Sequence, residues 1–267
     1  MGVRSVIFRS FRDNVQLGTW LAFVAGNVNS IAFVHFGTYV SHVSGHATRA
    51  SIHYADGDLT SAFLFFMEFM AFIFGAGVTS FLLRGYTAAS SQIKYTAPIV
   101  LEVLLISMYM ILVYTSSSDT QSSDYLSHLT FVLAVAMGIQ NAMLRQASGT
   151  FVRTTHVTGV ATDFGAELGA AVRLAFEEVV ALRMKIAGRV FIDRLRKSGF
   201  IFHTFILCAF SSGAVFGTIA FLIVRDLALI APISILTIIG ITEYRRVLEP
   251  HQDLPEGNRE NRERVAP

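Results

Sequence analysis

The chain has 267 residues, of which 53% are hydrophobic and only 15% are charged. A soluble domain carries roughly a quarter charged residues, so this composition argues against an ordinary soluble enzyme and is typical of a polytopic membrane protein. The formal net charge of +2 is too small to indicate nucleic-acid binding. A single cysteine, Cys208, excludes an intramolecular disulfide and a metal site built from several cysteines.

Apolar stretches long enough to cross a bilayer recur along the chain. A helical span needs about 20 mostly apolar residues. We therefore predict an all-α membrane helix bundle with six spans, at residues 17–39, 60–83, 97–114, 129–148, 200–224 and 227–241. The last two spans are so close that Arg225 and Asp226 must form a tight turn between them.

Basic residues occur in alternate connecting segments. They lie in the N-terminal tail (residues 1–15), after the second span, between spans four and five, and directly after the sixth span. Because basic segments tend to stay on the cytoplasmic side, we predict that both termini are cytoplasmic. The charged, proline-containing stretch 249–267 is expected to be disordered.

Residues 173–197 alternate apolar side chains with arginine and lysine. A basic amphipathic segment of this kind suits an anionic lipid surface. A solvated helix that packs on the bundle explains the pattern equally well.

A seven-residue motif occurs twice in similar form, as HVSGHAT at residues 42–48 and as HVTGVAT at residues 156–162. Further pairs match across the two halves: Gly26-Asn27-Val28-Asn29 with Gly138-Ile139-Gln140-Asn141, Gly75-Ala76 with Gly213-Ala214, and Ala97-Pro98-Ile99 with Ala231-Pro232-Ile233. We therefore predict two three-span units, residues 16–115 and 126–243, with the basic segment at about 169–197 as an insertion in the second. Because three is odd, the units must enter the membrane in opposite orientations.

Inverted repeats are a feature of secondary transporters, which bind substrate at the repeat interface near the midplane. The hydroxyl and the glycine of the motif suit the start of a short re-entrant helix whose N-terminus attracts anions, although an ordinary capped and closely packed helix explains them too. Asparagine and glutamine in the spans either join a central cluster or link helices. The candidate substrate-binding residues are Asn27, Asn29, Ser44, Gly45, Gln140, Asn141, Thr158 and Gly159.

Glu68 lies well inside the second predicted span, where a carboxylate is a functional candidate. One interpretation is that Glu68 is protonated and inert. The other is that it carries protons beside His35 or His42. Glu68 and His42 are therefore the candidates for proton coupling. His42, His46 and His53 share a helix face, but the second half has no matching set, and we expect no metal. The sequence contains no Gly-x-Ser-x-Gly elbow, Walker loop or HExxH motif, so we expect neither an enzyme nor a cofactor.

Two longer blocks carry a resemblance to a known family. The block MGIQNAMLRQASGTFVRTTHVTGVATDFGAEL resembles the second block of the YoaK-like membrane proteins, a family of unknown function, and GNVNSIAFVHFGTYVSHVSGHAT resembles the first. This chain has Asn29 where the family commonly has an acidic residue, and Ser44-Gly45-His46 where Thr-Gly-Asn is usual. The resemblance covers about residues 15–245 and implies a six-span integral membrane protein with no established substrate.

These observations favour a secondary transporter of a small solute, an anion being one candidate. Two other classes stay open. One is a channel or sensor. The other is a membrane scaffold that does not transport and that recruits partners or anionic lipids through its basic segment.

Overall fold

A computed structural model describes residues 11–84, 95–116, 129–148 and 157–248. Its helices follow in the order α1 (Phe11–Phe36), α2 (Val43–Ala55), α3 (Leu59–Arg84), α4 (Thr96–Ser116), α6 (Thr130–Ser148), α7 (Val157–Val180), α8 (Met184–Lys197), α9 (Phe200–Val224), the 3-10 helix η2 (Arg225–Leu229) and α10 (Ile230–Leu248). No strand occurs in these ranges, which confirms the all-α prediction. The predicted disordered tail, and residues 1–10 of the predicted basic tail, lie outside the described residues.

Four helical stretches are long and apolar enough to cross a membrane: Val15–Phe36, Leu59–Leu83, Thr96–Thr115 and Phe200–Arg245. The last holds α9, η2 and α10 in succession, so the predicted tight turn at Arg225 and Asp226 is the start of a 3-10 helix. A shorter apolar stretch, Thr130–Met143, forms most of α6. Large side chains such as Phe74 and Phe81 face outward from α3. Exposed apolar surface on this scale fits a lipid environment, so the chain is a multi-pass membrane protein.

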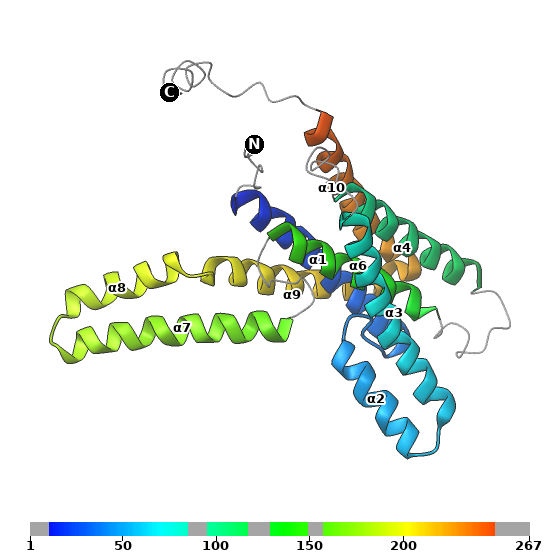
Figure 1. Cartoon of the computed structure of the whole chain (residues 1–267), viewed down its shortest axis with the longest axis horizontal. Coiled ribbons are helices and arrows are strands. Elements are labelled where there is room, and N and C mark those ends of the chain that lie inside the picture. The colour runs from blue at the N-terminus through cyan, green and yellow to red at the C-terminus, as the bar shows by residue number, and fades with distance from the viewer. Residues whose placement is uncertain (1–10, 85–94, 117–128, 149–156, 249–267) are drawn as a thin grey trace, which may run out of the picture.

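Two close helix crossings hold the bundle together. α1 packs along α9, and α3 packs along α6, so each crossing joins a helix of the first predicted unit to one of the second (Figure 1). In the first crossing, a Cβ atom added to Gly26 would lie 2.0 Å from the carbonyl oxygen of Phe210. A Cβ atom added to Gly213 would lie 2.1 Å from the carbonyl oxygen of Phe23. The backbones therefore touch at this crossing.

The α3–α6 crossing repeats this arrangement. A Cβ atom added to Gly75 would lie 2.1 Å from the carbonyl oxygen of Val135, and one added to Gly138 would lie 2.1 Å from that of Phe72. The Thr79 hydroxyl adds a hydrogen bond to the Ile139 carbonyl oxygen at 3.1 Å. Lipid tails are as apolar as leucine, so membrane helices associate through close van der Waals packing and hydrogen bonds between helices. Glycine at both contact points makes that packing possible here.

The remaining helices complete a common core. α4 packs on α6 and α10. Fully buried side chains from several helices meet there, among them Leu21, Val28, Ile106, Met137 and Leu236. The interior that positions the polar groups described below is therefore continuous across the two predicted units.

The α2–α3 hairpin is closed by a short polar turn. Gly57 has a φ of +79°, a left-handed conformation that favours glycine. Asp58 accepts a hydrogen bond from the Ser61 backbone N–H at 3.1 Å and caps the start of α3. The hydrogen bonds from the Ser61 side chain and backbone lower the pKa of Asp58, so the cap stays ionised at neutral pH. The His53 ring lies 3.2 Å from the same carboxylate and joins the end of α2 to the cap.

The predicted basic insertion belongs to an arm that extends from the bundle. Figure 1 shows α7 and α8 side by side as a hairpin that projects away from the other helices. The arm is attached to α9 through Glu167, which accepts a hydrogen bond from the Gly199 backbone N–H at 2.9 Å and lies 3.0 Å from the His203 ring. Phe164 stacks on Phe200 at a centroid distance of 4.6 Å. Glu167 thus docks the arm on α9.

Replacing Gly75 by alanine tests the crossing. We expect the Gly75→Ala change to destabilise the detergent-solubilised protein by about 1–3 kcal/mol or more, because the new methyl group overlaps a backbone carbonyl oxygen that cannot move alone. Gly77 on the same helix has open space at its Cβ position. Gly77→Ala should be neutral or stabilising by up to about 1 kcal/mol, through helix propensity. Thermal unfolding followed by intrinsic fluorescence measures both, and equal effects would contradict the account.

Removing the Glu167 carboxylate tests the attachment of the arm. Glu167→Ala deletes both contacts to the start of α9, so backbone amides of α7 and α8 should exchange hydrogen faster while those of α3 and α6 stay protected. Asp163→Ala is the matched control, since that exposed residue precedes the contact by about one helical turn. Hydrogen–deuterium exchange with mass spectrometry gives the readout. Unchanged exchange in the arm would refute a docking role for Glu167.

Candidate functional site

α2 is too short to span a membrane. Its 13 residues extend roughly 20 Å, against about 30 Å of hydrocarbon. After α1 ends at Phe36, residues 37–42 lead into α2, which runs back along the first part of α3. Gly37 has a φ of +71° and lets the chain leave α1 sharply. The first motif copy therefore lies at the start of a short helix held against a long one.

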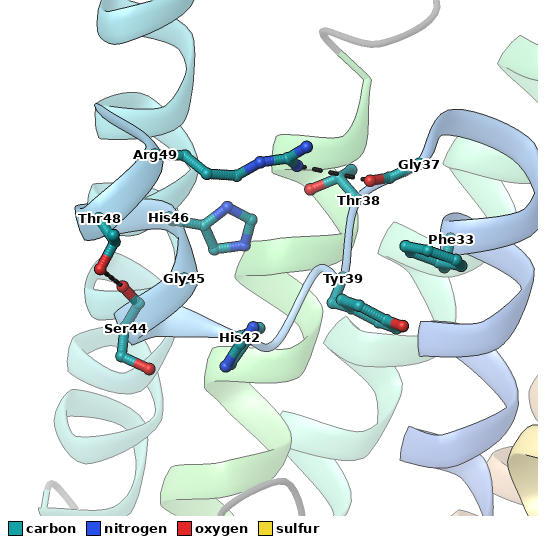
Figure 2. Close-up of a pocket in the computed structure, with 10 residues that line it drawn as sticks. All are labelled: Phe33, Gly37, Thr38, Tyr39, His42, Ser44, Gly45, His46, Thr48 and Arg49. Atoms are coloured by element: carbon teal, nitrogen blue, oxygen red, sulfur yellow. Dashed lines mark hydrogen bonds between the residues drawn. The ribbon is translucent and has the colours of Figure 1, made fainter. Parts of the chain in front are cut away.

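A pocket of about 470 Å³ opens between the start of α2 and the segment before it (Figure 2). Its lining comes from the first half of the chain: Phe33, Gly37, Thr38, Tyr39, His42, Ser44, Gly45, His46, Thr48 and Arg49. Phe33 and Tyr39 stack at a centroid distance of 4.2 Å and form an aromatic wall. The pocket thus combines hydroxyl, imidazole and guanidinium groups with one apolar side.

Arg49 supplies the permanent positive charge of the pocket. Its Nη1 donates to the Gly37 carbonyl oxygen at 3.4 Å, and its guanidinium carbon lies 4.7 Å above the Phe65 ring. These contacts, a carbonyl oxygen and an aromatic ring, hold the guanidinium group beside the pocket without neutralising its charge. Arginine held in this way is suited to bidentate recognition of an oxyanion.

The start of α2 faces the same space. His42 is the N-cap residue, and within the described residues no side chain caps the helix there. Ser44, predicted as a cap, is instead the second helical residue, and its carbonyl oxygen accepts the Thr48 hydroxyl at 2.9 Å. Uncapped N–H groups and the helix dipole both favour a bound anion.

Two buried polar atoms in the lining have neither a hydrogen-bond nor an ion-pair partner among the described residues. They are the Thr38 hydroxyl, on a residue 7% exposed, and Nε2 of His46, on a residue 2% exposed. In Figure 2 the Thr38, His46 and Arg49 side chains converge on one part of the pocket. Buried polar groups are normally hydrogen-bonded, so these atoms point to a ligand or to ordered water.

The other ring nitrogen of His46 contacts Glu68. Nδ1 of His46 lies 2.7 Å from Oε2 of Glu68, which is 7% exposed. The hydroxyl of Thr130, at the start of α6, donates to Oε1 of the same carboxylate. The prediction that His35 or His42 lies beside Glu68 is therefore wrong, since His46 is the histidine in contact with it. His35 instead lies 3.3 Å from Asp226, beside a separate cavity of about 300 Å³.

Gly45 makes room for His42. A Cβ atom added to Gly45 would lie 2.6 Å from Nδ1 of His42, so the imidazole packs directly on the glycine backbone. The motif glycine thus fixes where the first motif histidine lies at the pocket edge. This is a local packing role rather than a break in the helix.

The predicted polar span residues have separate roles. Asn29 holds the segment before α2, since its Oδ1 accepts both the backbone N–H and the hydroxyl of Ser41 at 3.1 and 3.0 Å. Gln140 donates to the Leu21 carbonyl oxygen at 2.5 Å and links α6 to α1. Asn141 is buried and has an interaction partner. Asn27 is fully buried in α1, and both polar atoms of its side chain lack a hydrogen-bond partner in the described ranges.

The second motif copy does not join this pocket. Thr158 and Gly159 lie in the first turn of α7, where the Thr158 carbonyl oxygen accepts the Thr162 hydroxyl at 2.8 Å. Figure 1 shows α2 and α7 in different parts of the molecule. Ser44 and Gly45 therefore line the described pocket, whereas Thr158 and Gly159 belong to the arm.

Sequence reasoning missed Arg49 as a pocket residue and His46 as the partner of Glu68. A signal was present, because His42, His46 and Arg49 recur at positions i, i+4 and i+7 on one face of α2. In the described ranges, no three or more His, Cys, Asp or Glu side chains are placed to hold a metal ion. The lining supplies cationic and hydroxyl groups, which suit an anion better than a cation.

Comparison with known protein families gives a match that covers most of the chain. The family model described as "Protein of unknown function (DUF1275)" matches residues 17–242. The chain belongs to the DUF1275 family. No curated protein and no solved structure matches it. The DUF1275 match covers both crossings, the pocket and the arm, so these features all lie within the family's extent.

Substituting Asn29 tests its structural role. Asn29→Ala removes two hydrogen bonds to Ser41 and the one that Nδ2 donates to the Ala25 carbonyl oxygen, and should lower stability by about 1–3 kcal/mol. A protonated aspartic acid has one acceptor oxygen and one donor, so Asn29→Asp can keep these contacts at acidic pH and should there retain most of that stability. Thermal unfolding in detergent separates the two variants. An equal loss in both would show that the acceptor is not what holds this segment.

Proposed function

We propose that this DUF1275 protein is a secondary transporter of a small anionic solute, which binds in the α2 pocket. The observation that carries the proposal is the convergence of Arg49, the uncapped start of α2 and two unpartnered buried polar atoms on one pocket. Arg49 carries a positive charge, the start of α2 and the Thr38 hydroxyl are donors, and Nε2 of His46 is a donor when the His46–Glu68 pair holds a proton. An oxyanion would satisfy these groups together. The bound solute would replace the water that these groups otherwise need.

The depth of the pocket supports transport over surface binding. Glu68 precedes the Gly75 crossing by seven residues, about 10 Å along a helix. His46 is level with Glu68 because the two side chains are in contact. The start of α2 therefore lies within one leaflet of the bilayer if the crossings mark its middle. Irregular backbone and charge at that depth are tolerated where they line a polar cavity.

The two equivalent helix crossings support an architecture of two inverted three-span units, which is typical of secondary transporters. Gly26 with Gly213 and Gly138 with Gly75 form equivalent backbone contacts, as two units of opposite orientation would. We take the full arrangement to be six spans, α1, α3, α4, α6, α9 and α10, with both termini and the basic arm in the cytoplasm. The pocket then opens toward the other side of the membrane. This arrangement also agrees with the resemblance to YoaK-like proteins.

Ligand-dependent thermal stability tests the binding step. Purified protein is heated with sulfate, phosphate, chloride or small mono- and dicarboxylates, at constant ionic strength. An anion that binds only the folded protein at 100 times its Kd adds roughly 2.7 kcal/mol of stability. We expect such an anion to lose most of this effect with Arg49→Gln and Thr38→Val.

Arg173→Gln is the control, because Arg173 is an exposed arginine of the arm that pairs with Glu177. It should leave the anion effect unchanged. Stabilisation that survives Arg49→Gln, or that disappears equally with Arg173→Gln, would contradict a site in the α2 pocket.

The arm favours a second candidate function, a scaffold that binds anionic lipid. Its tip exposes Val180, Leu182 and Met184, and Leu182 is 91% exposed. Basic side chains follow along α8: Lys185, Arg189, Arg194, Arg196 and Lys197. An apolar tip beside a basic face suits insertion at an anionic membrane surface.

Vesicle flotation tests the arm with the full-length protein in nanodiscs of neutral lipid. If the arm binds lipid, vesicles containing phosphatidylserine should capture the nanodiscs, and neutral vesicles should not. Lys185→Gln/Arg189→Gln/Arg196→Gln should abolish capture without changing anion stabilisation. Transport that persists in this variant assigns the arm a separate role.

A further inference from the structure

The contact between His46 and Glu68 has a counterpart in the second half of the chain, and the counterpart is apolar. Glu68 precedes Gly75 by seven residues, as Ile206 precedes Gly213. Thr130 precedes Gly138 by eight residues, as Gly18 precedes Gly26. His46 is the fifth residue of its motif copy, as Val160 is of the other. The set His46, Glu68 and Thr130 thus corresponds to Val160, Ile206 and Gly18.

The corresponding residues also meet in space. A Cβ atom added to Gly18 would lie 3.2 Å from Cδ1 of Ile206, which matches the contact of Thr130 with Glu68. Val160 and Ile206 belong to one buried cluster, which matches the contact of His46 with Glu68. The same helix arrangement is therefore built once with apolar side chains and once with a buried acid, imidazole and hydroxyl.

The apolar version shows that this packing does not need a charge. Burying an ionisable pair costs desolvation energy, and well-packed apolar residues often replace such a pair without loss of stability. In the membrane that cost makes an ionisable residue a functional candidate. His46 is also the residue that joins the pair to the pocket, because it lines the pocket while its Nδ1 faces Glu68.

We propose that Glu68 and His46 form a proton-binding site that couples proton uptake to anion binding in the α2 pocket. The inference rests on the proposed function. With one proton bound to either residue, the pair is neutral overall, as carboxylate and imidazolium or as acid and imidazole. Without that proton the pair carries one negative charge beside the bound anion and repels it. Anion binding therefore favours the protonated pair, and by linkage each anion that binds carries one proton with it.

Other titratable groups near the pair must be distinguished from it. On the α2 side, His42, Arg49 and Tyr39 line the pocket, and His53 stacks on Phe65, which also stacks on His46. Asp58 pairs with His53 at the end of that hairpin. α4 touches α3 and carries the buried Glu102. Between Thr130 and Met143, α6 contributes no titratable residue.

The test measures anion affinity against pH, together with proton uptake in weakly buffered solution, for the anion that stabilises the wild-type protein. For one linked proton, Kd should rise with pH by up to about tenfold per pH unit. One proton should be taken up per anion bound in that range. Glu68→Gln should remove both the pH dependence and the proton uptake, whatever affinity the variant has for the anion. His53→Gln and Glu102→Gln change titratable groups outside the pocket and should keep both.

A second variant separates coupling from folding. His46→Val/Glu68→Ile copies the residues of the second half, so it should keep or raise the thermal unfolding temperature while abolishing proton uptake. A marked loss of stability would assign the pair a structural role and overturn the proposal. Affinity that does not vary with pH in the wild type, or variation that persists in Glu68→Gln, would also overturn it and leave the transporter proposal standing.

Infrared difference spectra between acid and alkaline pH give a readout that needs no anion. A carboxyl band that titrates in the wild type, persists in Glu102→Gln and disappears in Glu68→Gln identifies the proton site. If no anion binds at all, the transporter proposal fails. The infrared signal then still decides whether the pair binds a proton, and its absence overturns the site itself.

Discussion

The helix bundle is held together by direct contact of helix backbones at two glycine pairs. At Gly26 with Gly213 and at Gly75 with Gly138, the helices approach so closely that a methyl group would overlap a carbonyl oxygen. Lipid provides no hydrophobic driving force between helices, so this packing is what fixes their register. The register in turn sets which residues of α2, α3 and α6 lie side by side, including His46, Glu68 and Thr130. A shift of one residue along α3 would turn Glu68 by about 100° away from both partners.

The two crossings are equivalent, but the polar groups beside them are not. Next to α3, the start of α2 lines a pocket that contains Arg49 and two unpartnered polar atoms. The corresponding position near α9 is filled by the apolar side chains of Val160 and Ile206. The arm replaces the short helix in the second half and docks through Glu167. One architecture thus carries two different attachments, a pocket on one side and a basic hairpin on the other. This difference is why we assign solute binding to the first motif copy.

The sequence predicted the helices well and the site only in part. Long apolar runs predict helices with little ambiguity, and each predicted span overlaps a helix, although only four stretches are long and apolar enough by themselves to cross a membrane. Glu68 was recognisable because a carboxylate is rare inside such a run. The histidine that contacts Glu68 could not be predicted, because the choice between His35, His42 and His46 depends on how α2 turns back along α3. The hydrogen bonds of Asn29 to Ser41 and of Gln140 to Leu21 could not be predicted, because they depend on helix contacts that no local pattern specifies.

We have proposed that the α2 pocket carries an anion across the membrane. The most direct measurement is uptake of a radiolabelled anion, chosen by its stabilising effect, into proteoliposomes of defined orientation. We expect saturable uptake by the wild-type protein that is lost with Arg49→Gln at equal protein incorporation and kept with Arg173→Gln. Uptake no greater than in empty liposomes, or equal uptake by wild type and Arg49→Gln, would contradict it.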